Sequence, residues 1–171
     1  CRFHDPLQME ENVRAAERAI DVCARMGIPW IRVFGNDIPD PSRMAETAAA
    51  VCQGLKRACA YGASRGVGVN LEVHGDFNTR QALKLVADEM ADVPGFGIVW
   101  DIEHSDKTCG DDFLPFYEVI RPLVRHVHVK DYLRGEGGAI IAAFAVAFVA
   151  AYLGIKNKKE ALGFDRNIPD G

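Results

Sequence analysis

The chain has little that points to a nucleic-acid-binding, membrane or disulfide-bonded protein. Its 20 Lys and Arg are outnumbered by 24 Asp and Glu, giving a formal net charge of -4. The basic residues form no stripe, so nucleic acid is not expected as a partner. Five cysteines occur without any CxxC pair, which favours buried thiols in a reducing compartment. No signal-peptide pattern opens the chain, and we therefore expect a cytoplasmic protein.

Long apolar runs are also scarce, with a single exception at residues 139–154, AIIAAFAVAFVAAYLG. This run is shorter than the ~20 apolar residues that a membrane-spanning helix needs. We interpret it as a buried helix that folds over an open side of the domain, and we expect no membrane association.

What the chain does contain is a regular alternation of helical and strand patterns. Short, mostly apolar strands are predicted at PWIRVFG, VGVNLEV, FGIVWDI and RHVHVKD. A helix is predicted before the first strand, from an Asp-Pro start at residues 5–6 to a stop at Gly27. Further helices are predicted between the strands, near residues 42–65, 78–90 and 111–121. Apolar strands separated by helices are typical of a parallel sheet buried by its helices. The sequence therefore predicts an α/β fold.

Three of these strands end in residues that bind divalent metals. Glu72 ends one strand, Asp101 ends the next, and His128 lies at the end of the last. Carboxyl ends of parallel strands meet at one rim of the sheet, where α/β enzymes place their sites. Carboxylate and imidazole donors together suit Mn²⁺, Co²⁺, Mg²⁺ or Zn²⁺. The alternative role for such a carboxylate is to cap the following helix or to pair with an arginine.

The last strand carries further polar residues beside His128. We expect His126 to point to the opposite face of the sheet and to be structural. Lys130 is expected on the same face as His128, where it would reach a substrate oxygen or phosphate. A structural ion pair with Asp131 or with another carboxylate of the rim is the alternative for this lysine.

The segments FHDP, IRVFG, LEVHG, WDIEH and HVHVKD, in this order and at these spacings, resemble the sugar isomerase and epimerase superfamily with the xylose isomerase-like TIM barrel. The resemblance spans roughly residues 1–137. It implies that residues 1–171 form one partial (β/α)8 TIM barrel domain, in which parallel strands alternate with helices. A full barrel has about 250 residues, so the first strands and the last strand are expected to be missing, with 138–171 a divergent C-terminal segment.

The resemblance also implies roles for individual residues. Glu72 corresponds to a metal-binding carboxylate that moves a proton in the epimerases, and Asp101 and His128 correspond to two further metal ligands. His104 and Arg134 fall where the family contacts substrate. The family's last ligand, a glutamate on the final strand, has no matching residue in this chain.

These residues imply a metal-dependent isomerase or epimerase of sugars, sugar phosphates or related polyols, acting through an enediolate. One alternative is a truncated barrel that binds but does not turn over its ligand. Another is an abasic-site DNA endonuclease on the same barrel, which the acidic charge balance disfavours. The open sheet edges also predict a homo-oligomer that covers them.

Overall fold

The computed structural model describes residues 2–110, 112–129, 132–134 and 140–142, and the chain divides into two compact units. The first unit is Cys1–Val129 and the second is Lys130–Gly171. In the second unit, β5 (Tyr132–Arg134) pairs antiparallel with β6 (Ile140–Ala142). The first unit holds all of the remaining described elements, and the following paragraphs concern it alone.

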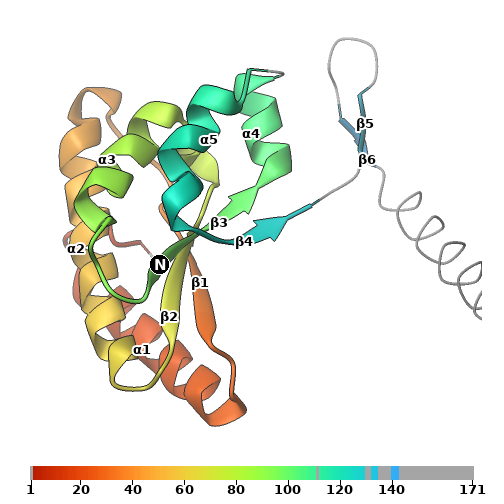
Figure 1. Ribbon diagram of the computed structural model, residues 1–171. Helices are drawn as coiled ribbons and strands as arrows, with labels where there is room; N and C mark the ends of the chain where they lie inside the picture. The colour runs from red at the N-terminus through yellow and green to blue at the C-terminus, as the bar shows by residue number, and fades with distance from the viewer. Residues whose placement is uncertain (1, 111, 130–131, 135–139, 143–171) are drawn as a thin grey trace, which may run out of the picture. The chain divides into compact units, whose positions relative to one another are not determined.

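A four-stranded parallel sheet forms the centre of the first unit (Figure 1). Its strands follow one another in chain order, β1-β2-β3-β4. They are β1 (Trp30–Phe34), β2 (Gly68–Glu72), β3 (Phe96–Asp101) and β4 (Val124–His128). The four predicted strands and their parallel arrangement are thus confirmed.

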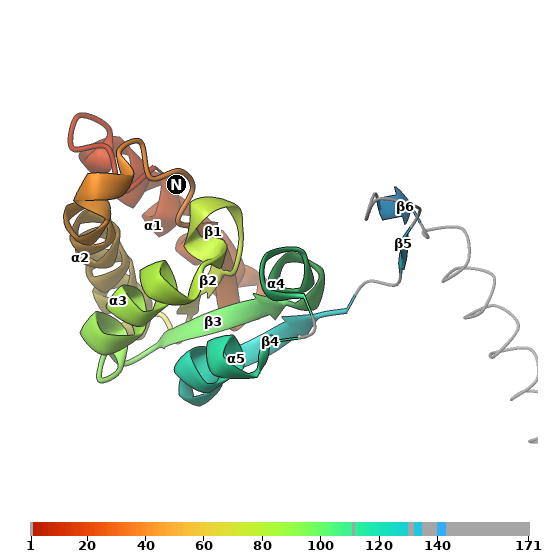
Figure 2. The ribbon, with the colours of Figure 1, turned by 90° about the horizontal axis from the view of Figure 1, so that it is seen from above.

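Helices connect the strands and lie along one face of the sheet, as Figures 1 and 2 show for α1, α2, α3 and α5. The α-helices are α1 (Met9–Met26), α2 (Met44–Ala63), α3 (Arg80–Met90), α4 (Ile102–Cys109) and α5 (Leu114–Ile120). Short 3-10 turns are η1 (Pro41–Arg43), η2 (Gly75–Asn78) and η3 (Arg121–Leu123). Because each helical connection returns the chain to the end of the sheet at which the strands begin, all four strands point the same way.

The core lies between the sheet and these helices. Alternate strand residues such as Ile31, Val33, Leu71 and Ile98 face the helices and are buried. Side chains alternate along a strand, so the intervening residues face the other side of the sheet. That second face carries most of the polar residues of the strands and, at its carboxyl end, the candidate site.

The boundaries of α1 show where the sequence was a good guide and where it was not. Gly27 ends the helix with φ 69°, as predicted, because glycine adopts this left-handed conformation without steric cost. The predicted start at residues 5–6 is wrong, since the helix begins at Met9. Asp5 instead accepts a hydrogen bond from the backbone N–H of Leu7, at 2.9 Å, in a turn that precedes the helix.

The predicted helix over residues 139–154 falls mostly outside the described residues. Its described part, Ile140–Ala142, is strand β6, so the prediction is wrong there. Within the part of the chain that the structure describes, we find no helix with the length and apolarity required to cross a membrane.

Candidate metal centre

The candidate centre is built from the carboxyl ends of three adjacent strands. Asp101 of β3 is paired with His128 of β4, and Glu72 of β2 is paired with Val99. Since Val99 and Asp101 are two residues apart, they share a face of the sheet. The sheet therefore brings Glu72, Asp101 and His128 to one rim, as the sequence predicted.

Distances between the polar atoms show how closely these side chains meet. The Nδ1 atom of His128 lies 3.2 Å from Oε1 of Glu72 and 3.7 Å from Oδ2 of Asp101. The Nε2 atom of His104, from the first turn of α4, lies 3.8 Å from the same Oδ2. One ligand atom each from Glu72, Asp101 and His104 lie within 4.8 Å of one another.

These separations fit a shared metal ion. Oxygen and nitrogen ligands about 2.0–2.2 Å from one ion lie roughly 3–4.4 Å from each other. The measured distances of 3.2, 3.7 and 3.8 Å fall within this interval. Glu72 and Asp101 are only 3% and 0% exposed, and buried carboxylates need a cation or strong hydrogen bonds. Glu72, Asp101 and His104 are therefore placed where they could hold a divalent cation, and His128 contacts both carboxylates beside them.

Asp101 has a second contact that fixes its orientation. Its Oδ1 atom accepts hydrogen bonds from the backbone N–H groups of Glu103, at 3.1 Å, and His104, at 3.4 Å. Asp101 is thus the N-cap of α4, a position at which aspartate is favoured. One oxygen begins the helix while the other faces the two imidazoles. The helix-capping alternative for this carboxylate is therefore correct, and it leaves the second oxygen for the site.

The helix α4 that carries His104 was not predicted. Its first turn is tied to β3 by Ser105, whose hydroxyl accepts a hydrogen bond from the indole N–H of Trp100 at 2.8 Å. The same hydroxyl donates to the backbone carbonyl of Asp101 at 3.3 Å. Together these contacts fix the imidazole of His104 beside the two carboxylates, whereas the resemblance gave it a substrate contact alone.

Aromatic side chains surround the polar cluster. The ring of His74 contacts those of Phe34 and His104 edge to face, with centroids 4.8 and 4.6 Å apart. The rings of His126 and His128 lie 5.2 Å apart. The expectation that His126 points to the opposite face is therefore wrong, because residues two apart in a strand share a face.

The residue that sequence reasoning missed is Arg32 of β1. Its Nη1 atom lies 2.7 Å from Oε2 of Glu72, so the arginine-pairing alternative for Glu72 is also correct. The signal was a single charged residue in the otherwise apolar strand WIRVF. The sequence, however, does not indicate that Arg32 and Glu72 lie next to each other on the neighbouring strands β1 and β2.

Two predicted substrate-binding residues belong to the second unit. Lys130 lies outside the described residues, and only the backbone of Arg134, in β5, is described. Their predicted roles stay predictions.

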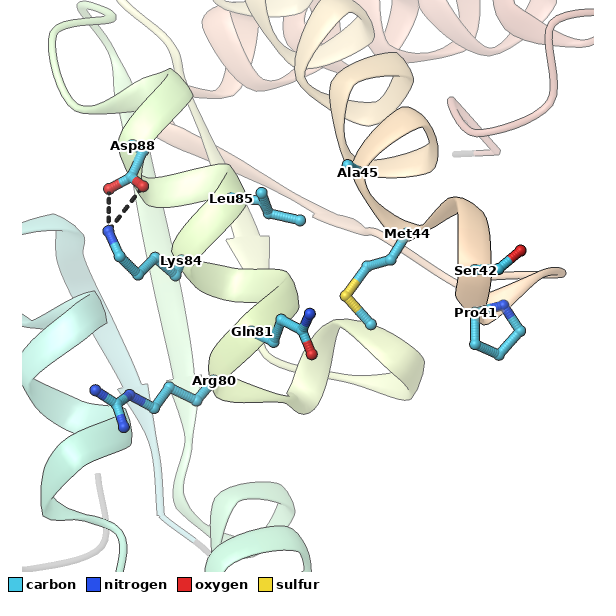
Figure 3. Close-up of a pocket in the computed structure, with 9 residues that line it drawn as sticks. All are labelled: Pro41, Ser42, Met44, Ala45, Arg80, Gln81, Lys84, Leu85 and Asp88. Atoms are coloured by element: carbon cyan, nitrogen blue, oxygen red, sulfur yellow. Dashed lines mark hydrogen bonds and ion pairs between the residues drawn. The ribbon is translucent and has the colours of Figure 1, made fainter.

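Two hollows in the first unit differ in their relation to the candidate centre. One, of about 250 Å³, lies on the polar face of the sheet and is lined in part by Arg32, Asn70 and His128. A larger one, of about 650 Å³, lies between η1, the start of α2 and α3 (Figure 3). Its single carboxylate, Asp88, is paired with Lys84, so it offers no ligand set. The smaller hollow is the one that reaches a candidate ligand, His128.

Comparisons with known proteins agree with the fold. The family described as a xylose isomerase-like TIM barrel matches residues 2–171. A xylose isomerase domain protein from Planctomyces limnophilus has a similar structure, with a TM-score of 0.58 and 19% identity over 90% of this chain. A sugar phosphate isomerase/epimerase from Parabacteroides distasonis ATCC 8503 gives a TM-score of 0.58 and 16% identity, again over 90% of this chain. The chain spans 58% and 56% of the lengths of these two proteins. The search of curated proteins gave no match.

Proposed function

Because the chain belongs to the xylose isomerase-like TIM barrel family, we propose that it carries the metal centre of an isomerase or epimerase. The substrates we propose are sugars, sugar phosphates or related polyols. The observation that supports this proposal is the meeting of Glu72, Asp101 and His128 at the carboxyl ends of adjacent parallel strands, with His104 of α4 beside them.

The reaction begins with removal of a proton from the carbon beside a carbonyl group. A divalent ion, when bound, supplies the positive charge that stabilises the resulting enediolate. Glu72, Asp101 and His128 would hold that ion. Glu72 is also the residue that would take the proton and return it, since a positioned carboxylate is a competent general base.

The substrate contacts we propose come from three cationic or hydrogen-bonding side chains. His104 faces the cluster from α4 and would contact a hydroxyl or carbonyl oxygen. Lys130 and Arg134 would bind further oxygens or a phosphate group, because ammonium and guanidinium groups pair well with these acceptors. We further propose a cytoplasmic location, in keeping with the free thiols of the described cysteines.

A second candidate is a binding domain that keeps the rim but does not complete a catalytic cycle. It is favoured by the ion pair of Arg32 with Glu72, which engages an oxygen of the carboxylate that catalysis would use. The two candidates share the metal ligands and differ in turnover.

Metal analysis combined with an activity screen on ketoses and inositols tests both candidates. We expect the purified chain to bind one equivalent of Mn²⁺ or Co²⁺. The variants Glu72→Gln and His128→Ala should lose most of this metal binding. If the chain shows epimerisation or isomerisation and Glu72→Gln abolishes it, the result supports the enzyme as the correct candidate. Metal binding without turnover supports the binding domain, and unchanged metal content in both variants contradicts the ligand assignment.

A further inference from the structure

Arg32 reaches from β1 to the candidate metal centre, where neither the sequence nor the resemblance gave it a role. Its guanidinium forms an ion pair with Glu72 at 2.7 Å. The arginine side chain is 49% exposed while that of Glu72 is 4% exposed. A partly solvated cation is thus held against a buried carboxylate.

The charge at this rim explains why a cation is needed there. Glu72 and Asp101 are both buried, and their oxygens lie close enough to share an ion. Two carboxylates in such a site repel each other and lose hydration. Arg32 supplies a positive charge next to one of these carboxylates.

The two oxygens of Glu72 have different neighbours. Oε2 faces Arg32, whereas Oε1 faces Nδ1 of His128. The guanidinium carbon of Arg32 also lies 4.5 Å from the ring centre of Phe34, in cation–π geometry. Phe34 therefore holds the guanidinium at the rim, beside the metal ligands.

We infer that Arg32 is the internal counter-cation of this carboxylate cluster and that it competes with the metal ion for Glu72. The inference rests on the proposed function, because it requires the cluster to bind metal. Arg32 stabilises the metal-free protein and weakens the metal-bound one, since a guanidinium repels a divalent ion at the same carboxylate. The opposing effects limit metal affinity.

Replacing Arg32 with an uncharged residue separates this role from a purely structural one. Arg32→Met should lower the melting temperature of the chelator-treated protein. It should also bind Mn²⁺ at least about tenfold more tightly than wild type in calorimetric titration, because the repelling charge is gone. A merely structural arginine would leave the affinity unchanged or weaken it.

Arg65→Met is the matched control. Its guanidinium also pairs with a carboxylate, that of Asp21 at 2.6 Å, and stacks on an aromatic ring, that of Tyr61. Arg65 precedes β2, whereas Glu72 ends that strand. We expect this variant to bind Mn²⁺ as wild type does. Arg32→Gln is the second test variant, because it keeps a donor for Glu72 without the charge and should show the same tightening.

The possible failures are distinguishable. Wild type that shows no saturable Mn²⁺ binding contradicts the proposed function and, with it, the role of Arg32. Wild-type binding that is lost in Glu72→Gln but is equal or weaker in Arg32→Met and Arg32→Gln overturns the role of Arg32 alone. A variant that folds only when Mn²⁺ is added supports the inference, because the ion then replaces the missing cation.

Discussion

The side-chain amide of Asn78 donates a hydrogen bond of 2.6 Å to the backbone carbonyl of His104. Asn78 ends η2, which follows the strand that carries Glu72, whereas His104 belongs to α4. The same amide also donates to Oγ1 of Thr108 at 2.6 Å. One buried asparagine therefore links the segments that carry two of the candidate ligands.

Asn78→Ala should destabilise the protein and loosen its metal centre. Loss of the amide leaves the carbonyl of His104 and the hydroxyl of Thr108 without this donor, which costs about 1–3 kcal/mol of unfolding free energy. Urea denaturation measures the loss, and Mn²⁺ titration should show weaker binding because α4 is less firmly held. Gln81→Ala, an exposed change on α3, is the control and should stay within about 0.5 kcal/mol of wild type. Equal stability of the two variants would contradict the linking role.

Gly62→Ala should be one of the costlier small substitutions in α2. A Cβ atom at this position would lie 2.1 Å from the backbone carbonyl oxygen of Val67. Because that oxygen belongs to the backbone just before β2, it cannot move without disturbing the strand, and we expect a loss of about 1–3 kcal/mol.

Thermal and urea unfolding of Gly62→Ala measure this cost. Ala60→Ser, on an exposed face of the same helix, is the matched control. A variant as stable as wild type would show that the turn between α2 and β2 adapts freely.

The buried thiols of α2 predict a loss of stability at alkaline pH. Burial raises the pKa of Cys52 and of Cys59 from 9.0 to about 12. Between these values the unfolded chain loses the two protons while the folded chain keeps them, so the free energy of unfolding falls as pH rises. Urea denaturation across this range should show a smaller decline for the Cys52→Ala, Cys59→Ala double variant.

Alkylation gives an independent check on the same thiols. In the folded protein at mildly alkaline pH, iodoacetamide should modify Cys52 and Cys59 far more slowly than the partly exposed Cys23, because the thiolate is the nucleophile. Equal rates for all three thiols, read by mass spectrometry, would refute the protection.

The sheet could be predicted from the sequence because its signals are local. The first three strands are short, mostly apolar runs, and the fourth, VRHVH, mixes valines with basic residues. Each strand is preceded by a helix with clear apolar spacing or a glycine stop. The helix α4 was missed because its eight residues, IEHSDKTC, show no apolar periodicity. Asp101 caps the helix and Ser105 binds Trp100 and Asp101 close by in the chain. The hydrogen bond from Asn78, 26 residues away, is tertiary, and no local pattern reveals it.

Part of the candidate site could also be predicted from the sequence. Parallel strand topology alone places Glu72, Asp101 and His128 at one rim, and the distances bear out that proximity. The contact of Arg32 with Glu72 depends on which strands are adjacent and in what register, namely Arg32 opposite Asn70. Register is a tertiary property, so the sequence shows the charged residue Arg32 but not that Glu72 is its partner.

The two carboxylate oxygens of Asp101 have different partners, and this limits which side chains can replace aspartate at this position. Asparagine keeps an oxygen for the amides of α4 but removes the negative charge that faces the imidazoles. Glutamate keeps the charge, yet its extra methylene moves the oxygen away from the amides that it must cap. Aspartate satisfies both demands, so tolerance to replacement at this position is set by two independent requirements rather than one.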